Sequence, residues 1–169
     1  MKTKTQKITL SALLAALIFV ATRFIQIPLP SVGYVNLGDV FVILAGWMLP
    51  GGYGFLAAGI GSALADLLSG FAIYAPVTFL IKGLMALLVG VIFKCLGKKN
   101  NSIKVLIVAL LAAFIAEAIM IAGYLVYESF LYGFKTAVLS VPFNGIQGVV
   151  GLIAGAELIN IWAEIKMSK

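Results

Sequence analysis

Charged residues are scarce in this chain: they make up 11% of its 169 residues, against about 25% in ordinary globular domains. Hydrophobic residues account for 63%, and the mean hydropathy is +1.15. A water-soluble domain of this size could not cover so much apolar surface with so few charges. The composition therefore excludes a soluble protein and predicts an all-α membrane protein built almost entirely of transmembrane helices.

Histidine is absent, and Cys95 is the only cysteine in the sequence. One cysteine excludes an internal disulfide, and the lack of histidine and of a CxxC pair argues against a zinc or redox centre. The sequence also lacks a GxxxxGK[ST] phosphate-binding loop, a nucleophile–base pair and a carboxylate-rich metal motif. We therefore expect no metal and no cofactor, and binding or transport is favoured over enzymatic chemistry.

The net charge of +6 does not come from a basic patch for nucleic acid. It comes from lysines at the edges of apolar segments, namely Lys2, Lys4, Lys7, Lys94, Lys98, Lys99, Lys104, Lys166 and Lys169. Cytoplasmic loops of membrane proteins carry an excess of lysine and arginine. An even number of spans places all of these lysines on one side, so both termini are predicted to be cytoplasmic. The expected surroundings are the lipid bilayer, with no nucleic acid.

Turn signals and charges divide the chain into six helices, which we predict to form one compact transmembrane bundle, a single domain of residues 1–169. The predicted helices cover residues 7–27, 38–49, 53–69, 76–96, 103–127 and 141–165. The uncharged stretch 40–65 could also form one kinked helix, but five spans would place the lysine clusters on opposite sides. The second helix, at about 18 Å, is shorter than a hydrocarbon core of about 30 Å. It must be shielded by its neighbours or extended through the preceding loop.

The few polar side chains inside these helices gather toward the predicted outer half of the bundle. Ionisable residues in membrane spans usually face the bundle interior or a cavity. Glu117, Tyr124 and Glu128 follow one helical stripe, and Asn144 and Gln147 share a face of the last helix. We predict an outward-facing pocket, roofed by the 28–37 loop, whose candidate substrate-binding residues are Tyr34, Asn36, Asp39, Tyr74, Lys82, Glu117, Tyr124, Asn144 and Gln147.

Simpler structural roles stay open for some of these polar residues. Asp39 could cap the helix that it opens, and Asn144 could cap the last helix. Glu128 is expected to be a solvated loop charge. Lys82 and Glu117 would each bury an uncompensated charge if alone, so we expect them to line one polar cavity together.

Several motifs resemble those of the substrate-binding S components of energy-coupling factor (ECF) vitamin transporters. The resemblance covers nearly the whole chain, and beyond the six-helix plan it rests on Ala12-x-x-x-Ala16, Tyr34-Val-Asn-Leu-Gly-Asp39, Gly51-Gly-Tyr-Gly54, Gly61-Ser-Ala-Leu-Ala-Asp66, Tyr74-Ala-Pro76 and Lys82-Gly83. It implies a multi-pass protein of the bacterial plasma membrane that captures a vitamin with high affinity and carries it inward, with the 31–37 segment as a lid.

The resemblance also implies partners. These are a membrane coupling subunit, which docks on Ala12 and Ala16, and two cytoplasmic ATPases. The ATPases would hydrolyse ATP, so the chain itself is not expected to be an enzyme.

The 34–83 block is most similar to the subgroup that takes hydroxymethylpyrimidine or vitamin B6 compounds. Amide, lysine and carboxylate groups in the predicted pocket suit such a small polar aromatic ring. A riboflavin-type S component remains an alternative. So do a structural membrane subunit without a ligand and a stand-alone ion-coupled secondary transporter, although the latter should show inverted repeats, which the two halves of the sequence do not.

Overall fold

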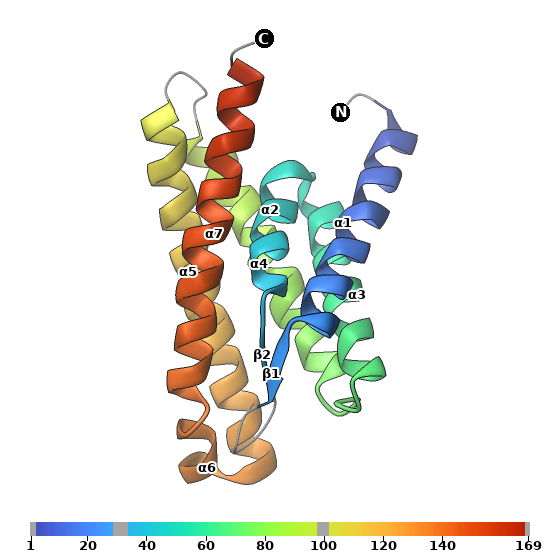
Figure 1. Ribbon diagram of the computed structural model, residues 1–169, viewed down its shortest axis with the longest axis vertical. Helices are drawn as coiled ribbons and strands as arrows, with labels where there is room; N and C mark the ends of the chain where they lie inside the picture. The colour runs from blue at the N-terminus through green and yellow to red at the C-terminus, as the bar shows by residue number, and fades with distance from the viewer. Residues whose placement is uncertain (1–2, 29–33, 98–101, 168–169) are drawn as a thin grey trace.

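The structure is a computed structural model that describes residues 3–28, 34–97 and 102–167. Long helices run up and down in a bundle (Figure 1). The helices are α1 (Lys4–Phe24), α2 (Gly38–Met48), α3 (Gly51–Leu68), α4 (Ala75–Leu96), α5 (Ser102–Tyr132), α6 (Phe134–Val138) and α7 (Val141–Met167). Two short strands, β1 (Gln26–Pro28) and β2 (Tyr34–Asn36), lie between α1 and α2.

The prediction of six bundled helices is confirmed in its helical architecture. Five helical segments are long and apolar enough to cross a membrane, namely α1, α3, α4, α5 and the α6–α7 segment. Helix α2 has 11 residues and is too short to do so alone. Helix α1 begins and α7 ends at the same end of the bundle, as an even number of crossings requires (Figure 1).

Local signals in the sequence set most helix ends. A capping box between Thr3 and Gln6 starts α1, Pro50 is the N-cap of α3, and a proline stands at the start of α4. Helix α5 continues past its predicted end at residue 127 and stops before Gly133, whose φ of +83° is a left-handed conformation that favours glycine.

The antiparallel hairpin between α1 and α2 was not predicted. Helix α1 ends at Phe24, so the predicted helical end at Ile27 is wrong, and Gln26 pairs with Asn36 in the hairpin register. The side chain of Gln26 donates hydrogen bonds to the carbonyl of Thr22 (3.0 Å) and to Oγ of Ser69 (2.9 Å). These bonds tie the hairpin to α1 and α3. Of the predicted 31–37 lid, residues 31–33 lie outside the described part of the chain.

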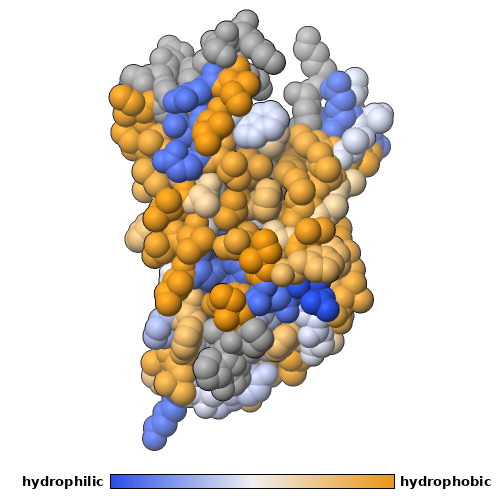
Figure 2. All heavy atoms as spheres, viewed as in Figure 1, coloured by the Kyte–Doolittle hydropathy of each residue, from blue (hydrophilic) through white to orange (hydrophobic). Residues whose placement is uncertain are grey.

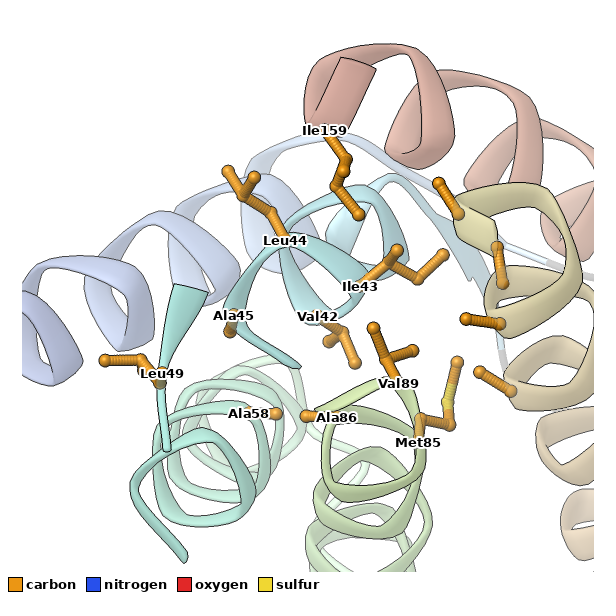
Figure 3. Packing of buried hydrophobic residues seen from close by; sticks show 14 of the residues in the cluster. Val42, Ile43, Leu44, Ala45, Leu49, Ala58, Met85, Ala86, Val89 and Ile159 are labelled. Carbon is orange, nitrogen blue, oxygen red and sulfur yellow. The ribbon is translucent and has the colours of Figure 1, made fainter. Parts of the chain in front are cut away.

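Helix α2 lies in the core of the bundle. Its buried side chains include Val42, Ile43 and Leu44, and they pack against residues such as Met85 of α4 and Ile159 of α7 (Figure 3). A helix that is apolar all round belongs in the interior. The short second helix is therefore shielded by its neighbours, one of the two solutions expected from its length.

Helices α1 and α3 approach each other closely at Gly61. A Cβ atom at this position would lie 2.5 Å from the carbonyl oxygen of Ala15, so no larger residue fits without a shift of the helices. The Ala15 side of α1 therefore faces the bundle, whereas Ala12 and Ala16 are exposed.

The outer surface of the bundle is apolar. Figure 2 shows hydrophobic side chains around the middle of the molecule, with hydrophilic ones near the end where α1 begins and α7 ends. Large exposed hydrophobic residues on the long helices include Ile107, Phe114 and Ile153. Such a surface is suited to contact with lipid tails.

Candidate functional site

A cavity lies at the hairpin end of the bundle, enclosed by five of the long helices and β2. Its volume is about 30 Å³, room for a water molecule rather than an organic ligand. The residues that line it are Thr22, Tyr34, Asn36, Ser62, Asp66, Phe71, Tyr74, Thr78, Lys82, Tyr124, Glu128, Asn144 and Gln147. Seven of the nine residues predicted to bind substrate line the cavity, and the other two, Asp39 and Glu117, do not.

A chain of polar contacts crosses the floor of this cavity. Lys82 of α4 forms a buried ion pair with Asp39 of α2. The other oxygen of Asp39 accepts a hydrogen bond from Nε2 of Gln147 at 2.5 Å. Oε1 of Gln147 in turn accepts from the backbone N–H of Asn36 at 2.8 Å and from its side-chain amide at 3.3 Å. Four elements, α4, α2, α7 and β2, are thus joined through polar groups buried among apolar helices.

The ion pair corrects the expectation for two carboxylates. Asp39 does not cap α2, because Leu37 is the N-cap residue and the Asp39 carboxylate binds Lys82 and Gln147. Lys82 therefore has Asp39 and not Glu117 as its counter-ion. Glu117 is buried beside Gly151 of α7, outside the cavity lining, and neither of its oxygens has a hydrogen-bond partner among the described residues.

Glu128 is also placed differently from the expectation of a solvated loop charge. It is 3% exposed and belongs to α5, which runs longer than predicted. Its carboxylate accepts hydrogen bonds from the hydroxyl groups of Tyr74 (3.4 Å) and Ser140. Asn144, the alternative helix cap, lines the cavity one turn after Ser140.

Aromatic rings form one wall of the cavity. The Tyr34 and Phe71 ring centroids are 5.0 Å apart, Phe71 and Tyr74 are 6.3 Å apart, and Tyr74 and Tyr124 are 6.4 Å apart. The ammonium group of Lys82 lies 5.6 Å from the centre of the Tyr124 ring, a distance typical of a cation–π contact. Rings arranged in this way offer flat faces to a planar ligand.

Tyr34 also fixes one carboxylate. Its phenol donates a hydrogen bond of 2.5 Å to Oδ1 of Asp66 on α3. Burial, together with the negative charge of Asp66, raises the pKa of the Tyr34 phenol above its ordinary value, so the phenol stays protonated and remains a donor.

Several lining residues were not in the predicted site set, namely Thr22, Ser62, Asp66, Phe71, Thr78 and Glu128. Ser62 and Asp66 carry a usable signal, because two polar residues four apart in an apolar segment share one helix face. Thr22 and Phe71 carry none, since nothing in their spacing points to the other polar groups.

The arrangement is suited to binding a small molecule. No cluster of three His, Cys, Asp or Glu side chains that could hold a metal ion occurs within residues 3–28, 34–97 and 102–167. The polar groups are hydrogen-bond donors and acceptors set among aromatic rings, which is the usual composition of a small-molecule site.

Comparisons with known proteins agree with this description. Residues 2–164 match the family model described as "ECF-type riboflavin transporter, S component". An uncharacterized protein of Pyrococcus woesei is 34% identical over 140 residues, which are 82% of this chain and 89% of that protein. The thiamine precursor transporter HmpT of Lactococcus lactis is 28% identical over 156 residues, 90% of this chain and 85% of HmpT.

Among solved structures, the crystal structure of FolT bound with folic acid superposes with a TM-score of 0.68. The match covers 92% of this chain and 93% of FolT at 20% identity, so it shows that the two proteins share a fold.

Proposed function

The chain belongs to the family of ECF-type transporter S components, and from this we propose that its cavity captures a small polar aromatic heterocycle, a hydroxymethylpyrimidine or a pyridoxine-like compound. Members of this family are components of transporters and not enzymes. The proposed step is high-affinity binding followed by movement of the heterocycle across the plasma membrane. ATP hydrolysis would belong to partner subunits.

The observation that carries the proposal is the mixed lining of the cavity. A wall of aromatic rings suits the faces of a heterocycle, and amide, hydroxyl and carboxylate groups suit its polar edge. The name of HmpT, a thiamine precursor transporter, supports a vitamin precursor as the ligand.

Riboflavin is the second candidate, because the matching family model carries its name. Ligand pockets usually measure about 300–1,000 Å³, so the side chains around a cavity of about 30 Å³ must move apart for any organic ligand. A single ring requires less displacement than the three fused rings of a flavin. Size therefore favours the smaller heterocycle.

Isothermal titration of the purified chain tests the proposed substrate class. Hydroxymethylpyrimidine, pyridoxine and riboflavin are titrated separately, and we expect saturable one-to-one binding of a one-ring compound without ATP hydrolysis. Binding of riboflavin alone would establish the second candidate. Concentrative uptake into proteoliposomes by the chain alone, driven by an ion gradient, would establish a secondary transporter instead.

The exposed alanines of α1 are proposed to dock on the membrane coupling subunit, which works with two cytoplasmic ATPases. Ala12 and Ala16 lie on the outer side of α1 and form a shallow strip where another helix could approach closely. We expect Ala16→Trp to reduce ATP-dependent uptake at least about tenfold while ligand affinity stays unchanged, because Ala16 is on the exposed side of α1 and the cavity lies inside the bundle. Uptake in cells and titration of the purified protein measure the two effects.

A tryptophan at an exposed position of another helix is the matched control. Leu80 of α4 is 53% exposed, and Leu80→Trp should leave both uptake and affinity as in the parent. Equal losses of uptake in the two variants would show that α1 has no special docking role.

Both termini are proposed to face the cytoplasm, because the end of the bundle where α1 begins and α7 ends carries Lys4, Lys7, Lys94 and Lys104. In a Cys95→Ala background, Lys135→Cys in α6 should react with a membrane-impermeant maleimide in intact cells. Lys104→Cys, at the start of α5, should react only after permeabilisation. The reverse labelling pattern would invert the proposed orientation.

A further inference from the structure

The cavity contains side-chain oxygens whose hydrogen-bonding capacity is unused. In the described part of the chain, Oγ1 of Thr22, Oγ of Ser62 and Oδ2 of Asp66 are buried without a partner, and all three residues line the cavity. Buried polar atoms in folded proteins nearly always have a partner. By contrast, Lys82 and Gln147 on the opposite side are engaged by Asp39. The three cavity-lining oxygens without a partner in the described part of the chain therefore all belong to α1 and α3.

Thr22, Ser62 and Asp66 lie at a similar level along the long axis of the bundle. Helices α1 and α3 run in the same direction (Figure 1), and Gly61 of α3 packs against Ile18 of α1. Thr22 is one turn beyond Ile18, Ser62 directly follows Gly61, and Asp66 is one turn beyond Ser62 on the same face of α3. The exposed fractions of Thr22, Ser62 and Asp66 are 3%, 1% and 4%. The set is fully shielded from solvent.

The chemistry of this set selects the ligand group. A carboxylate only accepts hydrogen bonds, and hydroxyl groups either accept or donate. Tyr34 already occupies Oδ1 of Asp66, and the hydroxyl group of Thr78, which pairs with the Tyr124 hydroxyl at 3.0 Å, also interacts with this carboxylate. Oδ2 keeps the capacity to accept from a further donor. A ligand group with two N–H bonds can donate to Oδ2 and to a neighbouring hydroxyl. An amino group on an aromatic ring has this geometry, and the Tyr34–Phe71 ring pair lies beside it.

We propose that Thr22, Ser62 and Asp66 form a subsite for the amino group of an amino-substituted aromatic heterocycle, with Oδ2 of Asp66 as the main acceptor. The inference rests on the proposed function and narrows it. It selects an aminopyrimidine over a pyridine alcohol such as pyridoxine and over riboflavin, because neither of these carries a primary amine on its ring.

Two ligands that differ in one group test the subsite. 4-Amino-5-hydroxymethyl-2-methylpyrimidine carries the amine, and its 4-oxo counterpart carries a carbonyl in the same place. We expect the parent to bind the amino compound at least about tenfold more tightly, the equivalent of one good hydrogen bond. In Asp66→Asn the carboxamide can donate to a carbonyl, so the preference should fall at least about tenfold or reverse.

Matched variants separate recognition from folding. Ser62→Ala and Thr22→Val each remove one hydroxyl group and should weaken the amino compound about 3- to 30-fold more than the oxo compound. These variants also keep the test decisive where Asp66→Asn does not fold. Glu157→Gln makes the same carboxylate-to-amide change at an exposed position of α7 and should behave as the parent.

The outcomes distinguish the two proposals. A parent protein that binds neither pyrimidine, pyridoxine nor riboflavin would overturn both. A parent that binds pyridoxine or riboflavin in place of the aminopyrimidine would overturn the subsite. If the parent binds the aminopyrimidine and all three variants keep the preference for the amino over the oxo compound, the subsite is refuted. The proposed function is retained in that case.

Discussion

Replacing Lys82 by methionine is expected to destabilise the folded protein by about 3–5 kcal/mol, the usual result of removing one partner of a buried ion pair. Methionine keeps the length of the side chain, so the effect is largely electrostatic. Asp39 is completely buried and, among the described residues, would retain only Gln147 as a partner. The measurement is thermal or denaturant unfolding of the purified protein in detergent.

A double variant provides the control. In Lys82→Met with Asp39→Asn, both charges disappear, and the amide still accepts a hydrogen bond from Gln147. Stability should return to within about 1–2 kcal/mol of the parent, because an uncharged pair of similar shape has no desolvation penalty. Lys135→Met, at an exposed position of α6, should have little effect. A double variant as unstable as Lys82→Met would show that packing and not charge dominates here.

The Lys82–Asp39 ion pair could not be predicted from the sequence. Spacing along one helix predicts which residues share a face, and it brought Tyr124, Asn144 and Gln147 correctly to one end of the bundle. Pairing between helices depends on how each helix is rotated about its axis, and the sequence does not contain that angle. For this reason Lys82 was matched with Glu117, although Asp39 of α2 is its partner.

The fold was predictable wherever a residue type restricts the backbone. Prolines and glycines marked the ends of α2, α3 and α4 to within a few residues. The β1–β2 hairpin was missed because its strands have three residues each and no alternating pattern. Missing the hairpin hid a contact of functional interest, since β2 supplies Tyr34 and Asn36 to the cavity.

The small volume of the cavity limits how a ligand can enter it. With about 30 Å³ of space, the cavity holds a heterocycle only after the side chains that line it move apart, and we expect the contacts between the hairpin and the helices to be among those that separate. The hairpin is held by hydrogen bonds from Gln26 to Thr22 and Ser69, by those between Asn36 and Gln147, and by the one from Tyr34 to Asp66. The bonds between Asn36 and Gln147 are also connected to the Lys82–Asp39 ion pair through Gln147. Opening of the hairpin is therefore coupled to the polar floor of the site.

Gln147→Ala is the sharpest test of this coupling, because the side chain of Gln147 on α7 is hydrogen-bonded to both β2 and α2. Its loss leaves the backbone N–H of Asn36 and one oxygen of Asp39 without their partner. Each buried group left unsatisfied costs about 1–3 kcal/mol, so the protein should be less stable by about 2–6 kcal/mol, less where water enters the space. With the hairpin released from α7 and held only through Gln26 and Tyr34 among the contacts described here, bound heterocycle should dissociate at least about tenfold faster, whereas association should change much less.

Stopped-flow release of bound ligand and unfolding in detergent measure the two effects of Gln147→Ala. Asn160→Ala removes an amide from the far end of the same helix, where the side chain bonds to Glu164, and should leave both the dissociation rate and the stability close to those of the parent. A Gln147→Ala protein that is less stable but releases ligand at the parent rate would refute the coupling, because the hairpin would then open independently of the polar floor. We expect faster release together with lower stability, because the hydrogen bond from Asn36 to Gln147 both holds the hairpin over the cavity and stabilises the fold.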